Sequence, residues 1–499
     1  MKILTASQTR EADAYTIKNE PISSIDLMER ASTAFVKIFL KKINKKNRVK
    51  IFCGTGNNGG DGLAISRLLM ENGYNTGTYV IKSGSNNTDD FKINYNRLTQ
   101  ISPIEEITSP ESIPQISSDD VLIDGIFGSG LTRPVSGLYG HVIDTINQSN
   151  ARIISIDIAS GLYADTPYVE GSVIKPWLTI TFQMPKLAFF IPENEPFTGD
   201  WIVTDIGLHK EFINSCETPY NLVDNNMIRE IPNQRRKFAH KGDFGRVALI
   251  AGSYGKMGAA ILASRACLKT GAGLLTAHIP KVGYEIMQSS VPEAMTTIDS
   301  GFEYLEGFPD LSIYDTLAFG PGLGTHPDTK KMVGKLLDSW QKPAIIDADG
   351  LNILSQNRKY LKLLKPGSIL TPHLKEFERI VGECSNHFER FDKQKDLSSQ
   401  LGIIIALKGA YTSISMPDGS IYFNNTGNPG MATGGSGDVL TGILAGIMAQ
   451  KYSSENTALM GVYLHGLAGD IAAGNMGQES VIASDITEYL PQAYEKIMS

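Results

Sequence analysis

The sequence predicts an α/β protein made of two tandem domains. At 499 residues, the chain exceeds what one hydrophobic core usually supports. Short apolar runs that end in glycine-containing turns alternate with helical patterns, first in one half and then again in the other. The composition, 41% hydrophobic and 20% charged, is typical of folded globular proteins. Each domain is therefore expected to have three layers, α/β/α, with a parallel sheet between helices.

The first half begins with helical patterns over residues 7–43, for which Ser23 and Ser24 are predicted as a cap. An apolar run at 49–53 leads through a glycine-rich loop, 54–62, into a helix at 63–73 and a strand at 76–82. This order is typical of the βαβ unit of a parallel sheet. Further strands are predicted to end at Asp124, near Asp157, and over 177–182 and 200–206.

The region from about 208 to 237 lacks this rhythm and is predicted to connect the domains. It is polar and contains Pro219 and Pro232, as inter-domain segments often do. The pattern then restarts, and the chain is predicted to close with two helices and a short tail. The expected elements are strands in 245–253, 273–280, 314–322, 342–350, 368–373 and 401–409, a hairpin at 411–425, and helices at 257–271, 437–450 and 455–474.

Charge and cysteine content limit the classes of function. The net charge is −7, so no overall basic field indicates nucleic-acid binding. No apolar run is long enough to cross a membrane, and residues 1–10 lack the apolar core of a signal peptide. The cysteines are scattered without CxxC spacing, which favours neither disulfides nor zinc. We expect a cytoplasmic protein that binds small molecules. The cysteines are Cys53, Cys216, Cys267 and Cys384.

Polar residues follow three strands of the first half. The loop GTGNNGGDG at 54–62 places Asn57 and Asn58 between a strand and a helix, where open α/β sheets bind ligands. Asparagine amides suit both a phosphate and a hard monovalent cation. Asp124 and Asp157 lie at strand ends and are expected to face the same crevice, although either could be a helix cap instead. Two such acids could divide cation binding from proton transfer.

The segment 428–442, NPGMATGGSGDVLTG, is the densest functional signal of the second half. Its glycines precede an apolar helical pattern, and Asp438 stands at the junction. A glycine-rich helix N-terminus binds phosphate through free N–H groups and the helix dipole. An acid there can act as a base on an attacking hydroxyl. We expect the helix terminus to keep Asp438 ionised.

Four other turns of the second half are expected to reach the same edge of the sheet. They are the glycine-rich segments 251–260 and 319–324, the strand end with Thr371 and His373, and the strand end with Lys408 and Gly409. His373 alone is more typical of a helix cap than of a ligand contact. Together with 428–442, these turns predict a site for a large, phosphate-rich pair of ligands.

The motifs NNGGDG, DGIFGSGLTRP, SIDIASG and TFQMPK of the first half resemble the NAD(P)HX epimerase family, a Rossmann-like domain also called the YjeF N-terminal domain. The resemblance covers residues 1–215 and implies interconversion of the R and S forms of the C6-hydrated cofactor. It implies Asp157 as the catalytic acid/base and Asn58, Asp124 and Ser160 as potassium ligands. The implied substrate contacts are Asn57, Asn58, Gly59, Gly60, Asp61, Gly128, Ser129, Gly130, Leu131, Thr132, Arg133, Pro134 and Asp157.

Two positions depart from the family pattern. Ala159 replaces the usual proline before Ser160, and Gln183 stands where glycine is common. The first departure is expected to loosen the turn that carries Ser160. Similar domains also serve as scaffolds in RNA-decay complexes, but a scaffold would not need both aspartates and an intact asparagine loop.

The motifs KGDFGRVALIAGS, GPGLG, TPHLKEF, KGA and NPGMATGGSGDVLTG resemble the ADP-dependent NAD(P)HX dehydratases, a family with the ribokinase-like fold. The resemblance covers about residues 235–490 of a domain expected over 225–499, and it implies Mg²⁺ and ADP as cofactor and co-substrate. It implies that Asp438 is the general base, and that Gly435, Ser436 and Gly437 form an anion hole. The other implied contacts are Ala259, Gly322, His373 and Asp438 to the hydrate, and Lys408, Gly409, Ala410, Tyr411, Thr412 and Gly437 to the nucleotide.

The two resemblances imply one repair task. Asp438 would take the proton of the C6 hydroxyl, which attacks the terminal phosphate of ADP; phosphate then leaves and the dihydronicotinamide is restored. The first domain would supply the reacting epimer from the other one, so NADHX and NADPHX are the expected substrates. A homo-oligomer is expected. The alternatives are a ribokinase-type small-molecule kinase with a regulatory nucleotide-binding first domain, and a scaffold.

Overall fold

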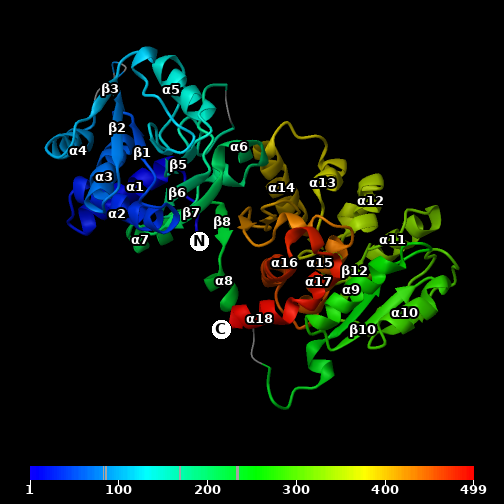
Figure 1. The fold of residues 1–499 in the computed structure, drawn as a ribbon. Helices are drawn as coiled ribbons and strands as arrows, with labels where there is room; N and C mark the ends of the chain where they lie inside the picture. Colours follow the sequence, from blue (N-terminus) through cyan, green and yellow to red (C-terminus); the bar gives the residue numbers. More distant parts are fainter. Residues whose placement is uncertain (83, 85–86, 168–169, 232–234, 499) are drawn as a thin grey trace. The chain divides into compact units, whose positions relative to one another are not determined.

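The computed structural model describes residues 1–82, 84, 87–167, 170–231 and 235–498. It divides into two compact units. The smaller comprises Lys2–Thr218 with Asn386–Phe388, and the larger comprises Met1, Pro219–Ser385 and Glu389–Ser499. Each unit contains a sheet between two helical layers, so the predicted three-layer α/β architecture is confirmed (Figure 1).

The smaller unit contains a sheet of order β3-β2-β1-β4-β5-β6-β7, in which every neighbouring pair is parallel among the described residues. Helices α2, α3 and α4 cover one face and α5 covers the other. Its elements are α1 Ala6–Asn19, α2 Ser24–Lys42, β1 Val49–Cys53, α3 Asn57–Glu71, β2 Thr76–Ile81, α4 Asp89–Thr99, β3 Glu105–Ile107, β4 Val121–Gly125, α5 Gly137–Gln148, β5 Arg152–Ile156, β6 Leu178–Phe182, α6 Glu195–Thr198, β7 Asp200–Thr204 and α7 Lys210–Ser215.

Successive side chains of the central strand β1 pack on opposite faces of this sheet, and all are buried. Ile51 packs against the α2–α3–α4 layer, whereas Phe52 packs toward α5. This is the period of two that a strand covered on both faces requires. The predicted cap is confirmed, since the Ser23 hydroxyl accepts a hydrogen bond from the Asp26 N–H at the start of α2.

The larger unit contains a ten-stranded sheet, counted over the described residues, of order β11-β10-β9-β12-β13-β14-β15-β16-β17-β8. The strands from β11 to β15 are parallel, and β16 and β17 form the predicted antiparallel hairpin. Its strands are β8 Tyr220–Val223, β9 Arg246–Ile250, β10 Leu274–Ile279, β11 Met295–Ile298, β12 Thr316–Phe319, β13 Ala344–Ile346, β14 Ile369–Leu370, β15 Ile404–Leu407, β16 Ser413–Ser415 and β17 Ile421–Asn424.

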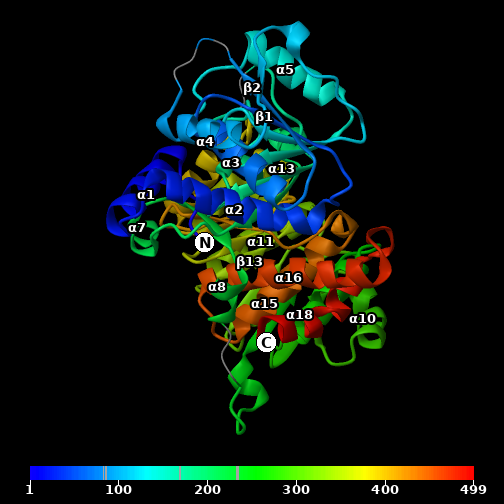
Figure 2. The same ribbon diagram turned by 60° about the vertical axis from the view of Figure 1, so that its left-hand side comes forward.

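Two helical layers enclose this second sheet. Helices α9, α15, α16, α17 and α18 pack on one face, and α11, α12 and α13 pack on the other. Figure 2 shows α15, α16 and α18 side by side. The helices are α8 Asn225–Arg229, α9 Met257–Lys269, α10 Tyr284–Ser290, α11 Pro327–Ser339, α12 Ala348–Gln356, α13 Leu374–Val381, α14 His387–Leu401, α15 Ser436–Ala449, α16 Ser454–Met476, α17 Ala483–Glu488 and α18 Leu490–Met498.

Three sequence-based expectations are wrong. The segment expected only to connect the domains contains α7, β8 and α8, and β8 pairs in parallel with β17; residues 232–234 of that segment, Pro232 included, lie outside the described residues. The predicted short tail instead forms α17 and α18, whose apolar residues Ile486, Leu490 and Ile497 join the core. The predicted loop 54–62 is helical from Asn57 onward.

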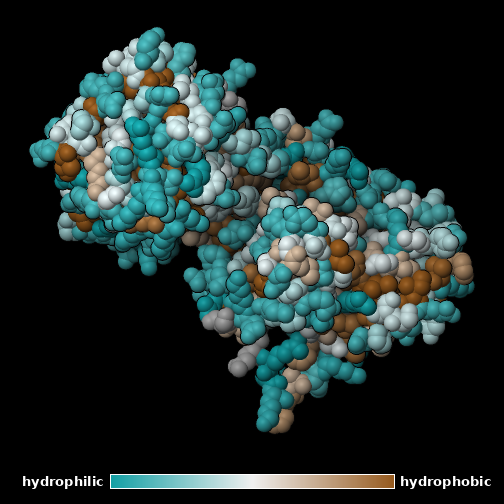
Figure 3. Space-filling model, in the orientation of Figure 1, coloured by the Kyte–Doolittle hydropathy of each residue, from teal (hydrophilic) through white to brown (hydrophobic). Residues whose placement is uncertain are grey.

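The surface is largely hydrophilic in the view of Figure 3, with hydrophobic side chains gathered where Figure 1 places α10. Tyr284 and Ile286 of α10 are among the exposed apolar side chains. None of the helices among the described residues has the length and apolar content needed to cross a membrane.

Candidate active sites

The N-terminus of α15 is formed by glycines that the fold requires. Gly435 is the N-cap residue with φ of 94°, and a β-carbon there would lie 2.5 Å from the Leu262 side chain. Only glycine adopts this left-handed conformation without strain. No side chain caps the helix at Gly435, so its first N–H groups lack that partner and favour an anion.

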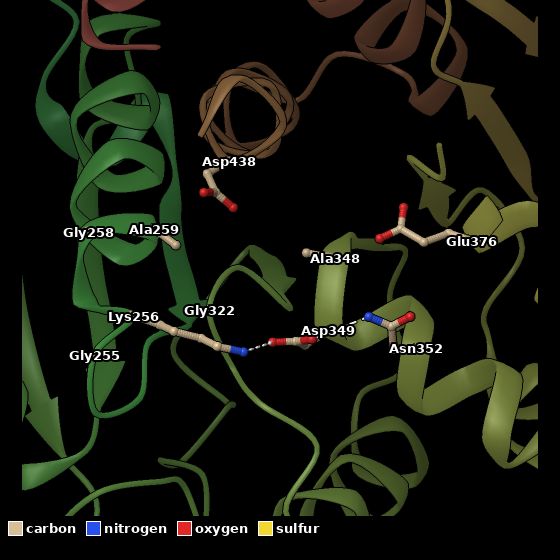
Figure 4. A pocket seen from close by; sticks show the side chains of 10 residues that line it. All are labelled: Gly255, Lys256, Gly258, Ala259, Gly322, Ala348, Asp349, Asn352, Glu376 and Asp438. Atoms are coloured by element: carbon tan, nitrogen blue, oxygen red, sulfur yellow. Dashed lines mark hydrogen bonds and ion pairs between the residues drawn. The ribbon is translucent and has the colours of Figure 1, made fainter. Parts of the chain in front are cut away.

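Asp438 lies in the first turn of α15 and lines a pocket of about 410 Å³. Figure 4 shows its carboxylate facing the space between α9 and α12, with Ala259 on one side and Ala348 on the other. Three predicted hydrate contacts, Ala259, Gly322 and Asp438, therefore line one pocket. The full lining is Gly255, Lys256, Gly258, Ala259, Gly322, Ala348, Asp349, Asn352, Glu376 and Asp438.

An ion pair between the partly exposed Lys408 and the buried Asp347 acts on Asp438. The Asp347 carboxylate, at the end of β13 and 1% exposed, accepts a hydrogen bond from Lys408 Nζ at 2.8 Å through Oδ1. Its Oδ2 accepts one from the Thr441 hydroxyl, also at 2.8 Å. A β-carbon on Gly437 would lie 3.1 Å from Lys408 Nζ. The lysine charge is thus held against the helix N-terminus, where a phosphate would bind.

The pKa of Asp438 corrects one expectation. Burial raises it to about 7, and the negative charge of Asp347 adds to the rise while Lys408 opposes it. The helix terminus was expected to keep Asp438 ionised, but desolvation outweighs the dipole here. A carboxyl group with a pKa near neutrality is better matched to proton transfer than an ordinary one.

Among the predicted nucleotide contacts outside α15, Lys408 reaches this helix terminus. Lys408, Gly409, Ala410, Tyr411 and Thr412 form the turn between β15 and β16. The Ser436 carbonyl accepts a hydrogen bond from His465 Nε2 at 3.0 Å. Burial lowers the pKa of His465 to about 4, so this imidazole is neutral and fixes the first turn of α15.

His373 caps α13 and does not line the pocket. Its Nδ1 accepts from the N–H groups of Lys375 and Glu376, and its own N–H donates to Glu376 Oε2 at 2.9 Å. This capping box turns the Glu376 carboxyl group into the pocket instead (Figure 4). Burial raises the pKa of Glu376, and Lys408 opposes the rise. His373 remains adjacent to Lys408 through a bridge between the two backbones.

Sequence reasoning missed several residues of this pocket. Asp349 accepts a hydrogen bond from Lys256 Nζ at 3.1 Å and from the Gly324 N–H at 2.8 Å. Asn352 Oδ1 accepts a hydrogen bond from the Arg379 guanidinium at 2.6 Å. The signal was the run DADG at a predicted strand end, which places Asp347 and Asp349 where ligands bind in open sheets.

In the smaller unit, the asparagine–glycine segment forms the first turn of α3. A β-carbon on Gly59 would lie 1.9 Å from the Gly54 carbonyl oxygen, and one on Gly62 would lie 2.7 Å from Cys53 Sγ. The glycines therefore let this helix approach β1 closely. The helix therefore begins at Asn57 and includes the predicted contacts Asn58, Gly59, Gly60 and Asp61.

The predicted potassium ligands meet in one cluster. Asp124, 1% exposed at the end of β4, accepts hydrogen bonds from the hydroxyls of Ser155 and Ser160. The Ser160 hydroxyl also contacts the Phe127 carbonyl, to which the Asn58 amide donates at 3.0 Å. Burial raises the pKa of Asp124, while its hydrogen bonds oppose the rise. The oxygen atoms of this cluster are hard ligands of the kind that would coordinate a potassium ion.

Asp157 follows β5 in a strained turn. Its φ is 63°, and the Ile158 N–H bonds to the Ile156 carbonyl at 2.7 Å, which closes a γ-turn around it. A non-glycine residue in this region marks a position that the fold enforces, often at a functional site. Asp157 Oδ1 lies 2.7 Å from the ammonium of Lys186.

Two further acids influence this position. Burial and the charge of Asp157 raise the pKa of Asp13, on α1, to about 6. The same two causes raise the pKa of Asp61, on α3, well above its usual range, while the Ser32 hydroxyl opposes the rise. Asp124, in contrast, accepts its side-chain hydrogen bonds from Ser155 and Ser160. Sequence reasoning missed Asp13 and Lys186, although Lys186 stood in the quoted motif TFQMPK.

The loop of predicted substrate contacts from Gly128 to Pro134 is partly exposed after β4. A β-carbon on Gly130 would lie 3.5 Å from the Arg10 guanidinium of α1. The other members, Ser129, Leu131, Thr132 and Arg133, follow the same exposed path. The loop therefore reaches solvent next to a basic side chain.

The two departures from the family pattern have separate structural roles. The buried Ala159 leaves the turn closed, since its carbonyl accepts from the Leu162 N–H and the Ser160 N–H donates to Asp124. Gln183 has φ of 63°, and its side-chain oxygen accepts from the N–H groups of Ile206 and Leu208. Gln183 thus secures the chain after β7.

Comparison with known proteins divides the chain into two parts that correspond to the two units. A family described as NAD(P)H-hydrate dehydratase matches residues 247–492, and one described as YjeF-related protein N-terminus matches residues 24–188. A solved Bacillus subtilis ADP/ATP-dependent NAD(P)H-hydrate dehydratase, co-crystallised with ATP and Mg²⁺, shares 27% identity and a TM-score of 0.48, over 56% of this chain and 98% of that one.

Relatives of known name match nearly the whole chain. The bifunctional NAD(P)H-hydrate repair enzyme of Thermofilum pendens is 34% identical over 99% of this chain and 96% of its own length. That of Moorella thermoacetica is 35% identical over 98% and 96%, and that of Escherichia coli is 30% identical over 92% and 88%. The chain therefore belongs to the family of bifunctional NAD(P)H-hydrate repair enzymes.

Proposed function

We propose that this enzyme repairs hydrated nicotinamide cofactors in two steps. Residues 1–215 interconvert R- and S-NAD(P)HX, and residues 225–499 dehydrate S-NAD(P)HX to NAD(P)H while ADP becomes AMP and phosphate. The observation that carries the second step is Asp438, with a pKa of about 7, lining a pocket beside the open N-terminus of α15.

The dehydration uses Asp438 as a base. Its carboxylate takes the proton of the C6 hydroxyl, and the hydroxyl oxygen attacks the terminal phosphorus of ADP as AMP leaves. The C6–O bond then breaks, phosphate departs, and the lone pair of the ring nitrogen forms an iminium. Loss of a proton from C5 restores the dihydronicotinamide, so phosphorylation converts a poor leaving group into a good one. A positioned base contributes about 10²–10⁴-fold to such a reaction.

The phosphates would bind where positive charge is already held. The N–H groups at Gly435–Gly437 and the ammonium of Lys408 form one electropositive edge. Preorganised donors of this kind stabilise charge in phosphoryl transfer. Glu376 and Asp349 are the pocket carboxylates suited to Mg²⁺, which commonly binds one or two carboxylates together with phosphate oxygens. When bound, the ion would neutralise charge on the phosphates.

The epimerase site is proposed around Asp157, with Asn57–Asp61 and Gly128–Pro134 as substrate contacts. Asn58, Asp124 and Ser160 would hold the potassium ion, a proposal supported by the oxygen cluster that joins them. The ion would help to orient the substrate. We further propose a homo-oligomer that works in the cytoplasm and binds neither nucleic acid nor membranes; the net charge of −7 supports the absence of nucleic-acid binding.

Replacing the base tests the proposal for the second unit. Asp438→Asn removes the proton acceptor with little change of shape, so dehydration of S-NADHX with ADP should fall by at least about 10²-fold. Epimerisation of the R form should continue, because Asp438 belongs to the other unit. Reduced-cofactor absorbance and separation of the epimers measure the two rates. Dehydration at the wild-type rate would remove Asp438 as the base.

A further inference from the structure

The two carboxylate oxygens of Asp157 have unequal surroundings. Oδ1 is bound by the Lys186 ammonium at 2.7 Å, the Phe182 N–H at 3.0 Å and the Thr181 hydroxyl at 3.2 Å. Oδ2 has no hydrogen-bond or ion-pair partner within the described parts of the chain. The carboxylate is therefore anchored through one oxygen and leaves the other for a ligand.

Lys186 makes its polar contacts inside the protein. Its side chain is 2% exposed. Besides Asp157, the ammonium lies 3.4 Å from the Met184 carbonyl and 3.5 Å from the Phe182 carbonyl. A buried ammonium is retained only when its charge is paired. Lys186 is thus held against Asp157 from behind and is shielded from solvent, where a substrate would enter.

Two other acids are influenced by Asp157. Asp13 belongs to α1 and Asp61 to α3, and each carries a pKa raised in part by the charge of Asp157. Lys186 forms an ion pair with Asp157, so its positive charge lies within this group of acids.

We propose that Lys186 is a positioning residue of the epimerase reaction. It fixes the Asp157 carboxylate through Oδ1 and leaves Oδ2 directed to the substrate. This inference rests on the proposed role of Asp157 as acid/base. The strained γ-turn supports it, because a residue at φ of 63° cannot easily adjust its side chain by moving the backbone.

The test replaces Lys186 with an uncharged side chain of similar length, in the full chain. For Lys186→Met, kcat for epimerisation of R-NADHX should fall by about tenfold or more, because displacement of a catalytic group by 1 Å can cost about 10²-fold. KM should not change, because Lys186 is 2% exposed and is paired with the Oδ1 side of the carboxylate. The loss should therefore appear in kcat alone, as expected for a residue that positions a catalytic group.

The chain offers a matched control in Lys50. This lysine of β1 is also 2% exposed and forms an ion pair with a buried carboxylate, Asp120 Oδ2, at 2.9 Å. Lys50→Met should lower stability but leave kcat and KM for epimerisation unchanged. Because both lysines belong to the smaller unit, circular dichroism of each full-length variant checks that this unit has folded. A Lys186→Met enzyme whose kcat and KM match those of Lys50→Met would overturn the inference.

A second variant tests the same anchor without changing a charge. Thr181→Val removes one donor to Oδ1, so kcat should fall while KM stays unchanged. Should Lys186→Met not fold, an unchanged kcat in Thr181→Val would contradict anchoring through Oδ1. Asp157→Asn separates this inference from the proposed function: if that variant epimerises normally, the role of Asp157 itself is wrong.

Discussion

At the scale of single residues, both proposed sites pair a carboxylate with a lysine, but in different ways. Lys186 binds Asp157 directly. Lys408 binds Asp347 instead. The charges of both side chains act on the pKa of Asp438, which Asp347 raises and Lys408 lowers. The second arrangement leaves Asp438 with a pKa of about 7, so small changes nearby should alter its ionisation at neutral pH.

This arrangement predicts the pH dependence of dehydration. Asp438 acts as a base only when it is ionised, so kcat/KM should decrease as the pH falls through about 7. In Asp347→Asn the negative charge that raises the pKa of Asp438 is lost, so the acidic limb of the pH–rate profile should move to lower pH. Rates of dehydration measured over roughly two pH units on either side of neutrality report the shift. An unmoved limb would show that Asp347 does not act on Asp438.

Sequence reasoning identified Asp438, Asp157 and Asp124 because each follows a recognisable turn or strand end. Asp347 and Lys186 were given no role because their importance arises from contacts. Lys408 meets Asp347 across 61 positions of sequence, and Lys186 meets Asp157 through the turn after β6. A pairing of this kind cannot be read from local spacing. Glu376 was missed because a cap, His373, decides its direction.

At the scale of elements, the position of Asp438 depends on the close packing of α15 against α9. A β-carbon on Gly442 would lie 2.1 Å from the Ala263 carbonyl oxygen, and one on Gly446 would lie 2.5 Å from the Cys267 carbonyl oxygen. These contacts are too short for any side chain. Gly442, the last residue of the motif, and Gly446 therefore let α15 pack closely against α9.

Substitution of Gly442 tests this role. Gly442→Ala must push the helices apart, so the free energy of unfolding of the larger unit should fall by roughly 1–3 kcal/mol. Gly474 of α16 is the control, because a β-carbon added there would have no neighbouring atom within 4 Å among the described residues. Gly474→Ala should gain up to about 1 kcal/mol from helix propensity. Urea denaturation followed by circular dichroism compares them; equal effects would contradict the packing account.

The sequence predicted most elements of both sheets, since buried five-residue strands and amphipathic helices have local signatures. Strand β8 could not be predicted in this way, because its partner β17 lies about two hundred positions away along the chain. The start of α3 was misplaced for another reason. Its glycines normally indicate a loop, whereas here they are demanded by contact with Gly54 and Cys53.

At the scale of the whole molecule, one chain carries two chemically dependent activities in separate compact units. The larger unit is proposed to act on the S epimer alone, and the smaller one to supply it from the R epimer. Because NAD(P)HX can pass between units through solution, the steps need no shared pocket. Variants defective in one unit should therefore complement each other when mixed.

The most direct test follows purified R-NADHX with ADP, measured by the return of reduced-cofactor absorbance. The wild-type enzyme should convert all of it, and Asp157→Asn or Asp438→Asn alone should leave it unrepaired apart from slow spontaneous epimerisation. A mixture of the two variants should restore repair, with one AMP formed for each cofactor recovered. Persistence of R-NADHX with the wild-type enzyme, or repair by either variant alone at the wild-type rate, would contradict the two-step account.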